Sequence, residues 1–153
     1  MMYSVKATHL AILLGSLTWL LVGCGGPYDS TVSGTVTLSS APLPRGTISF
    51  IPQGSGAPAY GMIEADGKYM LRTGREEGLK SGSYTATVAA NEVSVAVGKN
   101  GGPPPMGKPI TPDWYRDPAT SGLTFTVESG DNEINIDLTT TPPPGWKPPP
   151  KRR

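Results

Sequence analysis

Residues 31–38 read Thr-Val-Ser-Gly-Thr-Val-Thr-Leu, and this alternation decides the fold class. Valine, glycine or leucine occupies the even positions, whereas threonine or serine occupies the odd ones. Successive side chains of a strand point to opposite faces of a sheet. A period of two in β-branched residues therefore predicts a strand with one buried face.

The same alternation recurs along the chain and predicts more strands. Asp66-Gly67, between two of these apolar runs, is typical of a tight hairpin turn. Short strands at this spacing predict one all-β domain over residues 31–138, a single antiparallel β-sandwich of about seven strands. The further strands are expected at 47–51, 59–64, 69–72, 83–88, 123–127 and 134–138, with a short edge strand at 93–97.

Turns and loops are expected where proline, glycine, serine, aspartate and asparagine gather. These are turns at 39–42 and 129–132 and a long loop over 98–112. The inward positions of the strands make up the predicted core: Val32, Val36, Leu38, Ile48, Phe50, Ile63, Tyr69, Leu71, Tyr84, Val88, Leu123, Phe125, Val127, Ile134, Ile136 and Leu138.

The beginning of the chain has the organisation of an export signal. Lys6 precedes an apolar run over 10–22, which as a helix would span roughly 20 Å, well short of a ~30 Å hydrocarbon core. That length favours the apolar region of a signal peptide over a membrane-spanning helix. We therefore expect a signal peptide over 1–23 and a flexible tether over 24–30.

Leu21, Val22, Gly23 and Cys24 close the apolar run and resemble the lipobox of bacterial lipoproteins. The resemblance implies cleavage before Cys24 and acylation of its thiol, with the membrane as a partner through the acyl chains. The alternative is an ordinary cleaved signal with an incidental cysteine. The predicted location is the periplasmic or cell-surface face of a membrane.

The last segment, 139–153, is too rich in proline to bury a core and is predicted to be a disordered, extended tail. Four of its last seven residues are basic: Lys147, Lys151, Arg152 and Arg153. The tail could contact anionic envelope polymers or lipid head groups, and the alternative is a solvated spacer.

The inventory of reactive side chains argues against an enzyme. The only histidine is His9, inside the expected signal peptide, and the only cysteine is the expected lipidation site. Ser-His-Asp and Cys-His catalysis and His/Cys zinc sites are therefore excluded from the mature chain. No phosphate-binding or nucleophile-elbow motif occurs, and no cofactor or metal is expected.

Acidic and aromatic residues leave three weaker alternatives open. Glu64 with Glu128 would be a carboxylate pair for glycoside hydrolysis, although nothing in the spacing selects it. A calcium site is less expected than a simple turn around 129–132. The possible ligand platform consists of Trp114, Tyr115 and Tyr60. The possible calcium ligands are Asp131, Asn132, Glu133 and Asp137. The alternative for the aromatic residues is that they cover a sheet edge.

The domain and the two ends of the chain differ in their balance of basic and acidic residues. One of the 13 basic residues lies in the leader and four lie in the tail, which leaves eight against 12 acidic ones. A domain that is mildly acidic offers no basic face for nucleic acid.

Four segments together carry a family resemblance: 32–36, 42–52, 66–71 and 82–88. Through them the chain resembles the carboxypeptidase regulatory-like β-sandwich, which is also called transthyretin-like and has an immunoglobulin-like architecture. With 115–123 near its end, the chain is similar to small lipoproteins of planctomycetes. The resemblance implies an accessory module without catalytic residues, and it is silent about ligands.

Together these patterns predict a non-catalytic, membrane-anchored lipoprotein of the cell envelope. Its sandwich is expected to act as a structural or protein-interaction module, with envelope proteins as partners. The alternative is an accessory lipoprotein that binds carbohydrate or another ligand.

Overall fold

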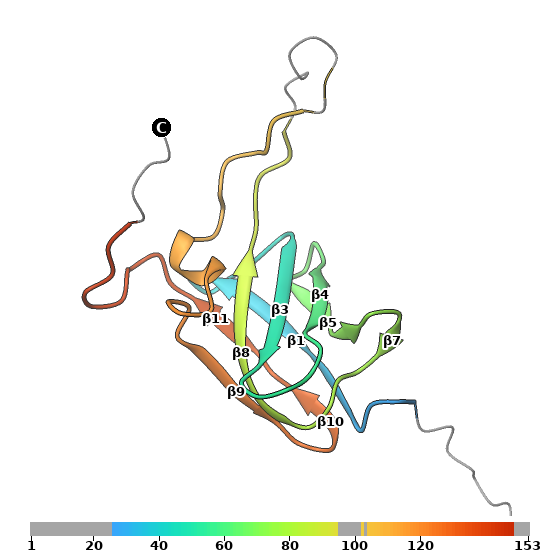
Figure 1. Cartoon of the computed structure of the whole chain (residues 1–153). Coiled ribbons are helices and arrows are strands. Elements are labelled where there is room, and N and C mark those ends of the chain that lie inside the picture. The colour runs from blue at the N-terminus through green and yellow to red at the C-terminus, as the bar shows by residue number, and fades with distance from the viewer. Residues whose placement is uncertain (1–25, 95–101, 103, 149–153) are drawn as a thin grey trace, which may run out of the picture.

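The protein is described by a computed structural model that covers residues 26–94, 102 and 104–148 (Figure 1). It is an all-β sandwich of two sheets, as the sequence predicts. The strands are β1 (Ser30–Leu38), β2 (Ala41–Pro42), β3 (Gly46–Pro52), β4 (Ala59–Ile63), β5 (Lys68–Met70), β6 (Arg72–Thr73), β7 (Glu76–Glu77), β8 (Gly82–Ala89), β9 (Leu123–Val127), β10 (Gly130–Glu133) and β11 (Ile136–Leu138), with one 3-10 helix, η2 (Asp113–Arg116).

The first sheet is centred on β1. Strands β5 and β2 pair antiparallel with it on one side, one after the other along its length. Strands β10 and β11 pair with it in parallel. The second sheet has the order β7-β6-β4-β3-β8-β9 and is antiparallel throughout. The prediction of an antiparallel sandwich therefore holds except where the end of the domain returns to β1.

The turn predicted over 129–132 is wrong for most of its length. Residues 130–133 form β10, in register with Ser30–Ser33. The hydroxyl of Thr31 donates to Asp131 at 2.6 Å, and that of Thr37 donates to Asp137 at 2.6 Å. Aspartate, which is typical of turns, here accepts hydrogen bonds from the neighbouring strand.

The last predicted strand, 134–138, is shorter than expected because a break in the strand at residues 134 and 135 separates β10 from β11. Three hydrogen bonds bridge the break: Ile134 N donates to Ser33 O at 2.8 Å, the Asn135 side chain accepts from Thr35 N at 2.8 Å, and Tyr69 donates its hydroxyl to Ile134 O at 2.7 Å. Burial raises the pKa of Tyr69 far above its ordinary value, so the hydroxyl keeps the proton that it donates.

Gly34 is the residue that allows this break. A Cβ at position 34 would overlap the carbonyl oxygen of Ile134 and lie 2.6 Å from its carbonyl carbon. The two backbones can approach this closely only because glycine lacks a side chain.

The predicted strand at 69–72 divides between the two sheets. Met70 pairs with Ser33 in the first sheet, whereas Arg72 pairs with Tyr60 in the second. Leu71 between them is fully buried. The hairpin turn at Asp66-Gly67 is confirmed, with Glu64 N donating to Lys68 O at 2.9 Å.

The core lies between the sheets, and the predicted core residues face it. Leu38, Leu123, Phe125 and Ile134 are only partly buried but pack against it. Phe50 lies at its centre, with Phe125 stacked on it at a centroid distance of 5.6 Å and Tyr84 at 6.0 Å. Two buried leucines that lie outside the alternating runs, Leu43 and Leu79, were not predicted as core, and Trp114 and Tyr115, considered above as a platform, are buried as well.

Two loops differ from expectation. Only Ser39 and Ser40 make the first turn, both with a left-handed backbone, while Ala41–Pro42 already pairs with β1. An edge strand was expected at 93–97. Val93 lies outside any strand and is 61% exposed, so the strand is not formed there. Residues 95–97 of the expected strand lie outside the described residues.

The long loop expected over 98–112 is approached by a paired stem that runs away from the sandwich in Figure 1. Glu92 N donates to Lys108 O at 2.8 Å, and Ile110 N donates to Ala90 O at 2.9 Å.

The domain is longer at both ends than predicted. Ser30, expected in the tether, begins β1 and is buried, and Asp29 before it bonds to Ser81. At the other end, Trp146 of the expected tail packs against the core. Within the described part of the chain no helix is long and apolar enough to cross a membrane.

Candidate functional site

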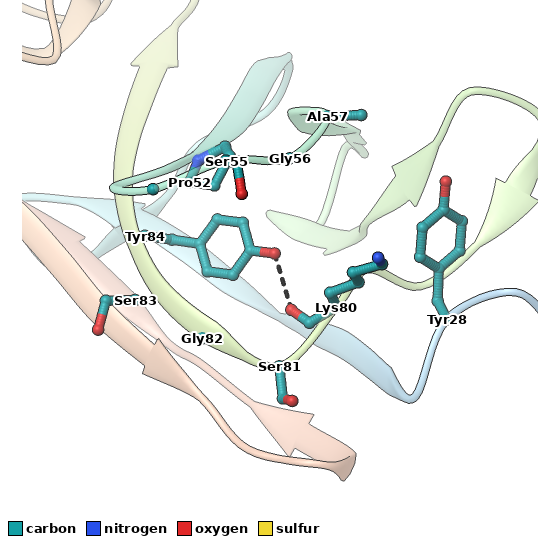
Figure 2. A pocket seen from close by; sticks show the side chains of 11 residues that line it. Tyr28, Pro52, Ser55, Gly56, Ala57, Lys80, Ser81, Gly82, Ser83 and Tyr84 are labelled. Atoms are coloured by element: carbon teal, nitrogen blue, oxygen red, sulfur yellow. Dashed lines mark hydrogen bonds between the residues drawn. The ribbon is translucent and has the colours of Figure 1, made fainter.

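A hollow lies where the chain enters the domain (Figure 2). It has a volume of about 430 Å³. Three segments surround it: Tyr28, the loop at 52–57 after β3, and residues 80–84 at the start of β8. We call it the Tyr28–Tyr84 hollow. Glycine and serine dominate its loop walls, because the chain turns sharply there on both sides.

Tyr84 fixes one wall of this hollow. Its hydroxyl donates to the backbone oxygen of Lys80 at 2.7 Å, the dashed line in Figure 2, and its ring packs on Phe50 in the core. Burial, with smaller contributions from Asp29 and Tyr28, raises the pKa of Tyr84. The hydroxyl is therefore a hydrogen-bond donor to the backbone and is not poised to ionise.

Asp29, next to Tyr28, fixes the segment that enters the domain beside this hollow. Its carboxylate accepts hydrogen bonds from Ser81, from the backbone N–H at 2.8 Å and the hydroxyl at 2.7 Å, and these lower the pKa of Asp29. Because the pKa is lower in the folded chain, the contact stabilises the fold above the ordinary carboxyl pKa. That stabilisation is lost as the pH falls through the lowered value. Asp29 thereby holds the entering chain against the start of β8.

The hollow offers groups that suit a polar ligand with an apolar face. Tyr28 presents a half-buried aromatic ring, while Lys80, Ser81 and Ser83 are exposed. Aromatic rings together with hydroxyl and ammonium donors are the usual lining of sites that hold hydroxyl-bearing ligands. Nothing in this lining supplies a nucleophile with an adjacent base.

The structure does not bring the three predicted platform residues together. Trp114 and Tyr115 are buried on η2, at 8% and 6% exposure, whereas Tyr60 is 51% exposed on β4. Tyr60 instead lies in a shallow depression with Met62 and Met70. The burial of Trp114 and Tyr115 favours the alternative that they cover the end of the sheet.

The carboxylate pair weighed for catalysis is not assembled. Glu64 follows β4 and Glu128 follows β9, two strands that are separated by β3 and β8 in one sheet. Three steps of about 4.8 Å already exceed the ~9.5 Å limit for glycoside hydrolysis. The strands also run in opposite directions, so the two residues lie at opposite ends of the sheet.

The residues considered as calcium ligands instead make hydrogen bonds within the first sheet. Asp131 and Asp137 accept from threonines of β1, and Asn132 bonds to the backbone of Thr31 and Glu128. Among the described residues, no three acidic, histidine or cysteine side chains gather as a metal site would require.

The lipobox residues Leu21, Val22, Gly23 and Cys24 lie outside the described residues. Acylation of Cys24 therefore remains a prediction from sequence.

Comparisons of the chain with family models, with curated proteins and with solved structures found no match. The resemblance to the carboxypeptidase regulatory-like sandwich and to planctomycete lipoproteins likewise remains a prediction.

Sequence reasoning missed the Tyr28–Tyr84 hollow. Tyr28 and Tyr84 are far apart in the chain, and hydrogen bonds of Asp29 with Ser81 and of Ser30 with Leu79 bring their segments together. The single local signal was the loop Gln53-Gly54-Ser55-Gly56, which indicates a bend without indicating what it faces.

Proposed function

We propose that this chain is an exported lipoprotein, held at a membrane by acylated Cys24, whose β-sandwich is a non-catalytic structural or protein-interaction module of the cell envelope. One observation carries the proposal: the only cysteine of the chain ends its only long apolar run, in the lipobox sequence Leu-Val-Gly-Cys. A chance cysteine would have no reason to lie at that position.

The start of the folded domain supports an anchor close to the sandwich. Strand β1 begins at Ser30, six residue steps after Cys24. Even fully extended, that stretch reaches only about 20 Å. The Tyr28–Tyr84 hollow would therefore lie near the membrane surface, and the stem at residues 90–92 and 108–110 would point elsewhere (Figure 1).

A non-catalytic role is supported by the side chains of the mature chain. Cleavage before Cys24 removes His9, the only imidazole, and acylation consumes the only thiol. The remaining candidates, Glu64 and Glu128, are at opposite ends of a sheet. Exposed apolar side chains on one face, namely Tyr60, Met62 and Met70, favour contact with a partner protein.

Replacing Cys24 with alanine tests the anchor. We expect the wild-type chain, expressed in a bacterial host, to incorporate labelled fatty acid and to carry an acylated cysteine at its new N-terminus by mass spectrometry. The alanine variant is expected to lose the label completely and to keep its unprocessed mass. Gly25→Ala, next to the site, is the matched control and is expected to be processed. An unmodified Cys24, or cleavage further downstream, would contradict the proposal.

A second candidate function, a ligand-binding accessory lipoprotein, is favoured by the Tyr28–Tyr84 hollow. If the hollow holds an oligosaccharide, the ring of Tyr28 would supply the stacking face and Lys80 a hydrogen-bond donor.

For this second candidate, titration of a panel of neutral and acidic oligosaccharides, followed by the tyrosine resonances in NMR, is the measurement. Tyr28→Ala is expected to weaken binding at least about tenfold, the effect of losing roughly 1.4 kcal/mol. Tyr60→Ala, an exposed tyrosine outside the hollow, is the control. Equal losses in the two variants, or no binding by the unaltered chain, would exclude this candidate.

A further inference from the structure

The segment after β11 folds back onto the domain. Thr139 N donates to the hydroxyl of Tyr115 at 3.0 Å, which ties the root of the segment to η2. Further along, Trp146 N donates to Pro143 O at 3.1 Å, and Gly145 between them has a φ of +81°. This left-handed turn, which glycine adopts readily, presents the indole of Trp146 to the domain.

The indole of Trp146 covers the ring of Trp114. The two ring centroids are 4.9 Å apart, and the planes meet at 68°, the edge-to-face arrangement that aromatic rings prefer. Trp146 is itself half-buried by this contact, and Trp114 is only 8% exposed. Tyr115 packs against Trp114 at a centroid distance of 5.7 Å. The segment at 139–146 is therefore part of what keeps Trp114 from solvent.

This segment is attached to the domain without strand pairing. Prolines at 142–144 carry no N–H group and cannot join a ladder, and the described segment after Leu138 pairs with no strand. Its described hydrogen bond to the domain is that of Thr139, and its described ring contact is that of Trp146. Such a segment can leave without unfolding either sheet.

We propose that the ring of Trp114 is a docking site for a tryptophan carried on a proline-rich segment. Residues 139–146 are its occupant within the chain, a releasable strap, and the same segment of a second copy is the partner that the site fits. Because the site needs only Trp114, Tyr115 and the strap, the inference does not depend on the acylation of Cys24.

The geometry sets an expected strength for this contact. A short linker presents its end at an effective concentration on the order of millimolar. For the strap to remain closed, the same segment as a free peptide must bind the uncovered site with a dissociation constant at or below about that value.

The first test removes the strap's indole from the full-length chain in detergent. Trp19→Phe in every variant leaves Trp114 and Trp146 as the only fluorescent indoles. Trp146→Ala is expected to shift Trp114 emission to the red and to raise its quenching by iodide several-fold. Trp146→Phe, which keeps a ring in place, is expected to preserve most of the shielding, and Lys147→Ala is the control. Equal iodide quenching of Trp114 in Trp146→Ala and in Trp146→Phe, the two variants in which it is the only indole, would overturn the proposal.

The second test asks whether the site accepts the segment from outside. A synthetic peptide of residues 139–148 is titrated into the ¹⁵N-labelled Trp146→Ala chain, in which Trp114 is the only labelled indole, and the indole N–H resonance of Trp114 is expected to shift saturably toward its wild-type position. A peptide with alanine at position 146 is expected to have no effect. Equal effects of the two peptides, or no saturation up to about ten millimolar, would show that Trp146 is only a fixed part of the fold.

Discussion

The free energy of unfolding is expected to fall by about 3 kcal/mol or more when Gly34 is replaced by alanine. The added Cβ would overlap the carbonyl oxygen of Ile134, which is backbone and cannot rotate away. That carbonyl also accepts the hydroxyl of Tyr69, so displacing it would leave a buried donor without a partner. Because β1 is the central strand of its sheet, the loss is a large part of the ~5–15 kcal/mol that holds a domain together.

Urea unfolding of the full chain, followed by circular dichroism, measures this effect. Gly54→Ala is the matched control, because a Cβ there meets nothing within 4 Å and its backbone is not left-handed. We expect the control to be neutral. If the stability of Gly34→Ala lay within about 0.5 kcal/mol of wild type, the close approach of β1 to Ile134 would be wrong.

Replacing Phe50 with alanine is expected to lower the free energy of unfolding by about 3–5 kcal/mol. Phe50 on β3 is fully buried and contacts Tyr84 on the adjacent strand β8 and Phe125 on the next strand, β9. Truncation removes the transfer free energy of the ring and leaves a cavity that close-packed neighbours fill only in part. Since Tyr84 also forms a wall of the Tyr28–Tyr84 hollow, the hollow is expected to loosen as well.

Met62→Ala is the control for this effect, because Met62 lies on the adjacent strand β4 but is 72% exposed. Its expected cost is within about 0.5 kcal/mol. Phe50→Leu, which keeps most of the volume, is expected to fall between the two. A cost below about 1 kcal/mol for Phe50→Ala would mean that the two sheets do not close over this ring.

Much of the fold follows from local pattern. The alternation in residues 31–38 and 83–88 predicted strands whose buried positions the structure confirms, because a strand between core and solvent imposes that period on its side chains. The turn at Asp66-Gly67 is confirmed for an equally local reason, since Gly67 adopts a φ of +83°.

Other elements depended on partners far along the chain. Asp131 and Asn132 have the composition of a turn, yet they lie in β10, because β1 offers a free edge and threonine donors about a hundred positions earlier. Trp146 lies in a stretch whose prolines predict an extended tail, yet the ring of Trp114 holds it. Local composition carries no information about such pairings.

By itself, then, the sequence determined which residues alternate, which stretches turn, and that the only cysteine ends an apolar run, since each of these depends on neighbours in the chain. Tertiary structure alone decided that the last strands run parallel to the first, that Tyr28 and Tyr84 share one hollow, and that Trp146 covers Trp114. The physical reason is that these contacts join residues that meet only after the sheets have formed, when burial of aromatic surface and pairing of free strand edges favour one arrangement.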